Sequence, residues 1–364
     1  MPSEPMVRLR QLRYSGDKRL VALHGLTLDI APGAIVALLG PRGAGKTTAL
    51  RLLAGFVRAE AGEMRVDGRL LDRTPPGRRG IGTVFDGADL LQNRNIGRNL
   101  AVPLHGLGFA EIESRVAALL RRFGLAGLGP LLPQRLTLVQ QHRAALACAV
   151  AGRPKLLLLD DPWAGLDPDE RGDMQDLLRS LAGEMTILHA TTDPQEALAV
   201  ADSIAVLDAG RLLQHGAAQA VYDAPTSLRT ASLLGPLNTL AGAVEAIEDD
   251  LAVIRLDCGP RVEALAVDVA AGDRCIMAVR PERVAVAAVS AEEMGDGALP
   301  ARILVIRPGG DHSRLRLIVG DGGTAAAMVV RRPAGVPLTG LAPGRQAAIA
   351  WQPYQARAFR AEPG

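Results

Sequence analysis

The segment GPRGAGKT, from Gly40 to Thr47, is the strongest indicator of the fold of this chain. It matches the spacing Gly-x-x-x-x-Gly-Lys-Ser/Thr at every fixed position. An apolar run before it, Ala34 to Leu39, predicts a buried strand, and apolar residues at helical spacing follow it from Lys46 to Phe56. Gly43 and Gly45 allow backbone N–H groups to curl round a polyphosphate, which also meets the positive end of the helix dipole. The stretch therefore predicts a phosphate-binding loop between a strand and a helix.

This loop implies metal-binding positions and a set of nucleotide contacts. Lys46 is placed to reach the outer phosphates of a nucleotide, and the Thr47 hydroxyl to bind Mg²⁺. A second apolar run, Leu156 to Leu159, ends in Asp160, whose carboxylate can hold the magnesium shell. A helix-capping role for Asp160 is the alternative. We expect nucleotide contacts along the whole loop: Gly40, Pro41, Arg42, Gly43, Ala44, Gly45, Lys46, Thr47 and Thr48.

The composition and the pattern of apolar runs indicate a folded chain of two domains. Of the 364 residues, 48% are apolar and 22% are charged, which excludes disorder throughout. One core rarely grows past about 250 to 300 residues, so this length favours two domains. The first two thirds alternate apolar runs with helical patterns, which predicts a parallel sheet with crossover helices. After about Gly235 the runs are short and alternating, which predicts a β-rich, barrel-like or sandwich-like domain. We place the domains at 1–235 and 236–364.

Local signals predict several element boundaries. The segments Asp167-Pro168-Asp169-Glu170 and Asp193-Pro194-Gln195-Glu196 both place Asp at the N-cap, Pro at N1 and Glu at N3 of a helix. Helices should therefore begin at both. The stretch from Arg302 to Gly320 predicts one hairpin, turned at residues 308–311.

Charge and cysteine content exclude other classes of protein. The formal net charge is +2, so no overall field points to nucleic acid or to an anionic membrane surface. Cys148, Cys258 and Cys275 are far apart and form no CxxC pair, which argues against a zinc site or a disulfide framework and favours a reducing compartment. No window reaches the roughly 18 to 20 apolar residues of a spanning helix, and the start has no apolar signal segment. We expect a chain that is neither secreted nor integral to a membrane.

Several stretches together resemble the nucleotide-binding subunits of ABC transporters. The segment LLLLDDPWAGLD, which ends at Asp167, resembles the Walker B and D-loop, and this resemblance assigns the D-loop to Gly165, Leu166 and Asp167. RRGIGTVF, from Arg78 to Phe85, resembles the approach to the Q-loop of that family. The stretch from Thr192 to Gly216 resembles its H-loop and the strands that follow.

The C-terminal part resembles the TOBE regulatory domain, most clearly in RPERVAVA from Arg280 to Ala287. LLGPLNTLAG, from Leu233 to Gly242, and AIAWQPYQAR, from Ala348 to Arg357, look most like the polyamine branch of the importers. The resemblance implies an α/β P-loop NTPase domain with a helical subdomain at about 87–150, followed by a β-rich, barrel-like (OB-like) TOBE domain. ATP and Mg²⁺ are the implied cofactors. Tyr14 is placed where the family has an aromatic that stacks on adenine; a surface or packing role for Tyr14 is the alternative.

Two catalytic positions depart from the family pattern. Asp161 stands where the family has the Glu that activates the attacking water, and its carboxylate is retracted by about 1.5 Å. A misplacement of about 1 Å can cost on the order of a hundredfold in rate, so we expect slow hydrolysis. Thr192 stands where the family has its switch His, and a hydroxyl offers no imidazole to the γ-phosphate. His189 lies within the predicted strand, which favours a packed His over a substitute.

The Q-loop and the signature segment also differ. Asp86 replaces the Q-loop Gln; it can bind Mg²⁺ as a carboxylate, or Asp86-Gly87 can simply form a turn. The family signature LSGGQ aligns with five residues that lack its glycines: Leu136, Thr137, Leu138, Val139 and Gln140. Leu138 and β-branched Val139 remove the close backbone approach that glycines allow to the γ-phosphate bound by a partner subunit.

These features imply a function and leave alternatives open. The leading hypothesis is an ATP-binding subunit of a bacterial-type ABC importer, peripheral at the cytoplasmic face of the inner membrane. It would work with membrane permease subunits and, indirectly, a substrate-binding protein. Family subunits pair head to tail, so a homodimer would have two damaged sites, and we expect a second, more intact ATP-binding subunit. The alternative is a nucleotide-sensing pseudoATPase. Near-neutral charge and a single phosphate loop disfavour a nucleic-acid ATPase.

Overall fold

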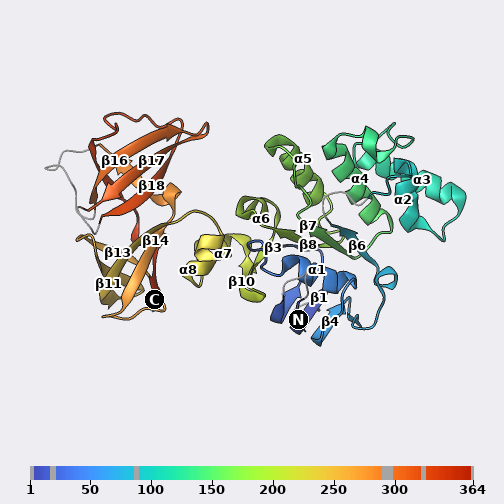
Figure 1. Cartoon of the computed structure of the whole chain (residues 1–364), viewed down its shortest axis with the longest axis horizontal. Coiled ribbons are helices and arrows are strands. Elements are labelled where there is room, and N and C mark those ends of the chain that lie inside the picture. Colours follow the sequence, from blue (N-terminus) through green and yellow to red (C-terminus); the bar gives the residue numbers. More distant parts are fainter. Residues whose placement is uncertain (1–3, 17–21, 86–89, 289–297, 321–324, 362–364) are drawn as a thin grey trace. The chain divides into compact units, whose positions relative to one another are not determined.

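The computed structural model describes residues 4–16, 22–85, 90–288, 298–320 and 325–361. The chain divides into two compact units, Met1–Tyr222 and Asp223–Gly364, and each has its own hydrophobic core. This boundary falls within helix α7 (Ala218–Asp223), upstream of residue 235, where the sequence pattern changes. Figure 1 shows that most of the helices belong to the N-terminal unit, whereas the C-terminal unit consists mainly of strands.

The N-terminal unit is built on a six-stranded sheet in the order β10-β9-β3-β8-β7-β6. The neighbouring strands run parallel, except β9 and β10. The strands are β3 (Ile35–Leu39), β6 (Ile81–Val84), β7 (Leu156–Asp160), β8 (Thr186–Thr191), β9 (Ser203–Asp208) and β10 (Arg211–Ala217). Every residue of β3, β7 and β8 is buried, as expected for parallel strands that are covered on both faces.

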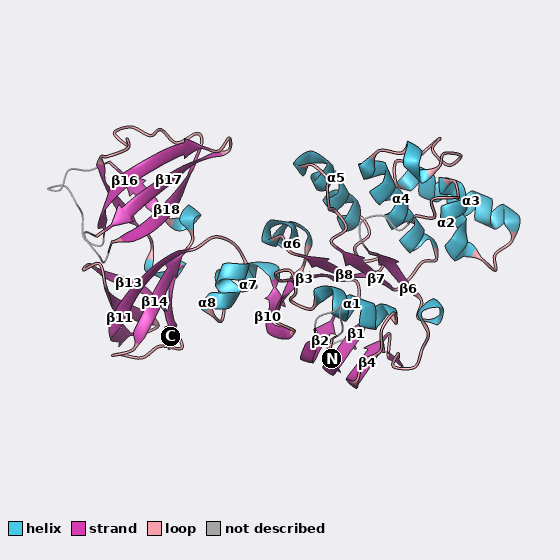
Figure 2. Ribbon diagram, in the orientation of Figure 1, coloured by secondary structure: helices cyan, strands magenta, loops and turns pink. Residues whose placement is uncertain are grey.

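Helices cover this sheet on both faces. Helix α1 (Lys46–Ala54) packs on β7 and β8, and α6 (Pro194–Val200) packs on β3 and β8. Figure 2 draws α1 and α6 on opposite sides of the sheet. Beyond α1 lies an antiparallel sheet in the order β2-β1-β4-β5. Its strands are β1 (Val7–Tyr14), β2 (Leu23–Ile30), β4 (Ala61–Val66) and β5 (Arg69–Leu70). One apolar core joins α1 to both sheets and includes Leu9, Leu50 and Leu158.

A helical segment follows β6. It contains α2 (Ile96–Ala101), α3 (Phe109–Arg122) and α4 (Leu138–Ala151), which pack on one another. Helix α5 (Pro168–Arg179) follows β7, and both predicted helix starts are confirmed, because Asp167 caps α5 and Asp193 caps α6. Short 3₁₀ turns are η1 (Pro76–Arg78), η2 (Val102–Leu104), η3 (Pro133–Arg135), η4 (Pro281–Arg283) and η6 (Pro353–Gln355). Among the described residues, no helix is both long and apolar enough to cross a membrane.

The C-terminal unit starts with α8 (Leu228–Leu233) and contains a closed barrel and an open sheet. The barrel has the order β11-β12-β13-β20-β14. Its strands are β11 (Asn238–Glu248), β12 (Leu251–Leu256), β13 (Arg261–Val267), β14 (Arg274–Val279) and β20 (Ala356–Arg360). The sheet has the order β15-β19-β16-β17-β18. Its strands are β15 (Ala285–Ala287), β16 (Leu299–Pro308), β17 (His312–Val319), β18 (Ala326–Pro333) and β19 (Gln346–Ala350). β16 and β17 form the predicted hairpin.

Candidate nucleotide-binding site

The phosphate loop connects β3 to α1 in a conformation that only its glycines permit without strain. Gly43 and Gly45 have φ values of +80° and +98°, in the left-handed region. A Cβ on Gly40 would lie 2.2 Å from the carbonyl oxygen of Leu207 in β9, so the loop rests directly on the sheet. A Cβ on Gly43 would meet nothing within 4 Å, so that side of the loop is open. The loop is therefore fixed on one side and accessible on the other.

The start of α1 offers its backbone donors to an anion. The first N–H groups of a helix have no acceptor within the helix, and no side chain caps them here, since the N-cap residue is Gly45. The Lys46 Nζ donates to the carbonyl oxygens of Gly40 (2.8 Å) and Pro41 (3.1 Å) and so lies over the loop. Burial lowers the pKa of Lys46, while Asp161 and Asp160 act in the opposite direction. These uncapped donors and this ammonium fit the phosphates of a nucleotide.

The predicted magnesium ligands lie on packed elements. Asp160 is the buried last residue of β7, and Thr47 is half-buried in the first turn of α1, which packs on β7. Asp86 lies outside the described residues. No cluster of His, Cys, Asp and Glu in the described part of the chain could hold a metal by itself. Thr47 and Asp160 therefore fit a Mg²⁺ that is shared with nucleotide phosphates, the usual mode for this ion.

Asp161 follows β7 directly and is exposed. Its φ is +42°, so a residue other than glycine occupies the left-handed region, and its N–H donates to the carbonyl of Ala190 in β8 (2.9 Å). Asp tolerates this conformation better than most residues. Thr192, which follows β8, is also exposed. Asp161 and Thr192 thus both stand at the carboxyl edge of the sheet, the edge at which β7 ends in Asp160.

A buried polar group that includes Glu196 supports this edge, and the sequence had given Glu196 only a helix-start role. The Thr191 hydroxyl donates to the Glu196 carboxylate and accepts from the N–H of Asp193 (3.0 Å). Glu196 therefore does not close a capping box on α6, unlike Glu170 on α5. The pKa of Glu196 is raised to about 7, chiefly by burial and also by the charges of Asp193 and Asp161, while the hydrogen bond from Thr191 and the charge of Arg171 act in the opposite direction. Glu196 thus holds the turn that carries Thr192.

His189 is fully buried in β8, as expected for a packed side chain. Its Nε2 lies 3.9 Å from a Glu196 carboxylate oxygen, and its ring lies 6.0 Å from that of Trp163. Burial lowers its pKa to about 4, so His189 is neutral at pH 7. Its two ring nitrogens and the indole N–H of Trp163 have no hydrogen-bond partner among the described residues. Trp163 carried no signal in the sequence that would have placed it in this group.

The signature segment is used to start α4. Thr137 caps the helix, and its side chain and that of Gln140 form a reciprocal capping box. Leu138 is 45% exposed, and a Cβ on Gly165 would lie 3.2 Å from its Cδ2. Val139 is half-buried. Thr137 and Gln140, the two polar residues of this segment, therefore cap its own helix.

The remaining signature and D-loop positions, and Tyr14, have simple placements. Leu136 and Leu166 are buried, and Gly165 is exposed with a φ of +84°. Asp167 caps α5. Tyr14 ends β1, is half-buried and packs on the core of the N-terminal unit. The structure thus gives Tyr14 a packing contact and leaves part of the side chain exposed.

Comparisons with known proteins agree with this geometry. Residues 23–164 match the ABC transporter family and residues 277–359 match the TOBE domain. The chain is 37% identical to the spermidine/putrescine import ATP-binding protein PotA of Rubrobacter xylanophilus over 353 residues, which cover 95% of this chain and 91% of that protein. It is 38% identical to the sulfate/thiosulfate import ATP-binding protein CysA of Mycobacterium bovis, with 75% of this chain and 77% of that protein covered.

A solved structure shares the fold of the N-terminal unit. It is cbiO1 from Clostridium perfringens, described as part of the ABC transporter complex cbiONQ, with a TM-score of 0.56 and 26% identity. The match covers 61% of this chain and 92% of that one. The expected P-loop NTPase fold with a β-rich TOBE domain is confirmed. The chain therefore belongs to the ABC transporter family, as an importer-type ATP-binding subunit with a C-terminal TOBE domain.

Proposed function

We propose that this chain binds MgATP at a head-to-tail dimer interface and thereby drives or gates uptake through a bacterial-type ABC importer, with slow ATP hydrolysis. The observation that carries this proposal is the contrast within one site. The phosphate loop, Lys46 and Asp160 are complete and well placed, whereas Asp161 and Thr192 stand exposed at the catalytic edge. A relative that matches over most of this chain is named for spermidine and putrescine import, which supports a polyamine as the cargo class.

Each residue of the loop has a role in nucleotide binding. The backbone from Gly40 to Thr48 surrounds the phosphates, and Lys46 neutralises their outer charges. Thr47 and Asp160 would hold Mg²⁺, which supplies charge neutralisation at the β- and γ-phosphates. Tyr14 offers its exposed part to the adenine ring. All of these contacts favour binding and none depends on Asp161.

Hydrolysis lacks two of its usual groups. The carboxylate of Asp161 is shorter than that of Glu by about 1.5 Å, which is enough to misplace an attacking water. Thr192 presents a hydroxyl and no imidazole. His189 does not replace it, because it is fully buried and its pKa of about 4 leaves it neutral. The site is thus suited to bind ATP and to hydrolyse it slowly.

A phosphate-release assay at saturating MgATP tests this proposal. Asp161→Glu should raise the rate by about tenfold to a hundredfold, since it restores the reach of the carboxylate. Lys46→Ala should abolish nucleotide binding, and Asp161→Asn should leave binding intact while it lowers the rate further. A parent rate that equals the rate of Asp161→Glu and lies well above that of Lys46→Ala would contradict impaired hydrolysis.

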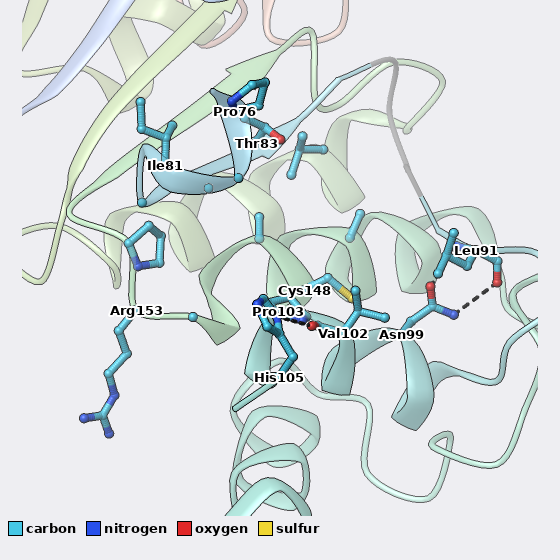
Figure 3. A pocket seen from close by; sticks show the side chains of 18 residues that line it. Pro76, Ile81, Thr83, Leu91, Asn99, Val102, Pro103, His105, Cys148 and Arg153 are labelled. Atoms are coloured by element: carbon cyan, nitrogen blue, oxygen red, sulfur yellow. Dashed lines mark hydrogen bonds between the residues drawn. The ribbon is translucent and has the colours of Figure 1, made fainter. Parts of the chain in front are cut away.

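We place the permease contact beside Asp86. A cavity of about 570 Å³ is lined by β6, which ends at Val84, two residues before Asp86 in the sequence, and by α2, η2 and α4 (Figure 3). Two apolar side chains on its wall are exposed, Leu91 by 45% and Val102 by 42%. Such apolar exposure in a groove favours contact with another protein. Peripheral attachment at the cytoplasmic face of the inner membrane would follow from this contact, with a substrate-binding protein reached through the permease.

Pairing with a second, more intact ATP-binding subunit is the arrangement we propose. Thr137 and Gln140 are engaged in the cap of α4, so the signature segment offers few side-chain hydrogen bonds to the nucleotide of a partner subunit. A homodimer would combine this segment with Asp161 and Thr192 at both sites. Coexpression with the neighbouring transporter subunits, followed by native mass spectrometry, tests the pairing. A pure homodimer with the turnover of an intact family member would refute it.

The capping box of Thr137 and Gln140 also favours one alternative. In this alternative the chain is a nucleotide-sensing pseudoATPase that holds a dimer interface without turnover. In that case Lys46→Ala and Asp161→Glu would both match the parent at background rates of phosphate release, while the parent still binds ATP tightly. We expect no nucleic-acid partner, and salt-sensitive RNA binding would overturn that expectation.

A further inference from the structure

A second cavity of the N-terminal unit, of about 380 Å³, lies far from the chemistry described above. Its lining includes Lys155 and Met185, which directly precede β7 and β8. It therefore opens at the amino ends of these strands, the opposite edge of the sheet from Asp160. Helix α3 and the last turn of α4 supply the other walls. An occupant would contact the helical segment and the sheet together.

The lining of this cavity is strongly basic. Its charged side chains are Arg115, Arg122, Arg153, Lys155 and one acid, Glu184. Two of the cations are already neutralised. Arg122 donates to both oxygens of Glu184, at 2.9 and 2.7 Å, and Lys155 donates to Asp67 at 2.6 Å.

Arg115 and Arg153 are the other two cations of the lining. Neither forms a salt bridge with a carboxylate of the described residues. The charge of Arg153 contributes, after Arg122, to the lowered pKa of Glu184, so Arg153 lies within electrostatic range of that carboxylate. Arg115 and Arg153 both line this cavity and form no salt bridge within the described residues, so they can offer N–H donors to an oxyanion, which Arg binds with paired N–H groups.

The backbone at Arg153 is held in an unfavourable conformation. Its φ is +52°, the left-handed region, although Gly152 beside it has a φ of −72° and Pro154 follows. A helix end usually gives the left-handed position to glycine. Figure 3 shows the Arg153 side chain extending away from the other labelled residues of the first cavity. Arg153 also lines the second cavity, and its side chain is exposed. Strain of this kind concentrates at binding sites.

The rest of the lining is apolar, with Leu119, Val150 and Met185 among its members. A bare inorganic anion would leave this surface unused. An organic molecule that carries the anionic group would cover it and gain from its burial.

We propose that this cavity binds a small organic anion with a doubly charged oxyanion group. Arg115 and Arg153 bind the oxyanion, and the organic part packs on Leu119, Val150 and Met185. The site is separate from the phosphate loop and does not depend on ATP. Because α4 begins at the signature segment and ends at this cavity, an occupant touches the far end of the helix that Thr137 caps.

Calorimetric titration of the full chain with phenyl phosphate tests the proposal. Lys46→Ala is included in every variant, so that the phosphate loop does not capture the probe, and ionic strength is held constant. We expect saturable binding at one site per chain. Arg115→Gln and Arg153→Gln should each weaken it by about fivefold or more. Arg121→Gln, an exposed position on the same helix that does not line the cavity, is the matched control and should change nothing.

Inorganic phosphate and phenol separate the two halves of the site. Both should bind more weakly than phenyl phosphate, since each lacks one set of contacts. Absence of saturable binding, or equal losses in Arg121→Gln and Arg115→Gln, would overturn the site. Inorganic phosphate that binds as tightly as phenyl phosphate would overturn the organic ligand class. Equal melting temperatures of the variants would show that their losses are not caused by misfolding.

Discussion

The buried pair of Glu196 and His189 makes a prediction about the pH dependence of folding, because its two members act in opposite directions. Burial raises the pKa of Glu196 from 4.5 to about 7 and lowers that of His189 from 6.5 to about 4. Each pKa is displaced by about 2.5, which corresponds to about 3 kcal/mol at 1.36 kcal/mol for each pKa unit.

The signs follow from proton binding. Between about pH 4.5 and 7 the folded chain keeps the Glu196 proton that the unfolded chain releases, so the free energy of unfolding falls as pH rises. Between about pH 4 and 6.5 the unfolded chain binds a proton at His189 that the folded chain excludes, so the free energy of unfolding rises with pH. In the parent protein the two contributions largely cancel from about pH 4.5 to 6.5.

Single substitutions separate them. In Glu196→Gln only the His189 contribution should remain, so the free energy of unfolding should rise by up to about 3 kcal/mol from pH 4 to 6.5. His189→Phe should leave the Glu196 contribution, so stability falls by a similar amount from pH 4.5 to 7. Urea unfolding across this range measures both. A Trp351→Phe background makes Trp163 the reporter of the N-terminal unit.

Two results would refute this reasoning. One is a pH dependence in both variants that equals that of the parent. The other is the same change in Glu113→Gln, which removes an exposed carboxylate of α3 far from the pair in sequence.

Three further substitutions have expected outcomes. Gly40→Ala places a methyl group 2.2 Å from the Leu207 carbonyl, so it should cost about 1 to 3 kcal/mol of stability and weaken ATP binding, as measured by urea unfolding and nucleotide titration. Arg153→Gly should raise the stability of the N-terminal unit by about 0.5 to 1 kcal/mol, because the relief of left-handed strain exceeds the added freedom of the unfolded chain. A lower unfolding midpoint in this variant would contradict the strain at Arg153. Thr137→Ala removes the cap of α4 and should cost about 1 kcal/mol, and an unchanged midpoint would show that the cap contributes nothing.

Local signals in the sequence predicted much of the fold. The phosphate loop, the apolar strands β3 and β7, and the starts of α5 and α6 all depend on residues that are near one another in the chain. The spacing of such residues is directly readable. The β16–β17 hairpin was predictable for the same reason, since its turn lies between its two strands.

The rest of the site depends on contacts that the spacing of residues in the sequence does not show. Glu196 has the spacing of a capping residue, yet its carboxylate accepts a hydrogen bond from the Thr191 hydroxyl, because the end of β8 brings that hydroxyl within reach. The close approach of Leu138 to Gly165 joins two segments that the sequence separates. The arginines of the second cavity come from α3 and from the end of α4, and only packing of the helices brings them to one space.

The left-handed backbone at Asp161 has a consequence for how this chain could change. Asp accepts a φ of +42° more readily than Glu does, so the backbone after β7 is adapted to the shorter residue. A substitution of Asp161 by Glu would gain reach and take on strain of about 1 kcal/mol or more. A strain-free Glu at this position would need a second change that relaxes the turn between Asp160 and Trp163. The longer carboxylate is therefore one substitution away in the sequence and at least two away in conformation.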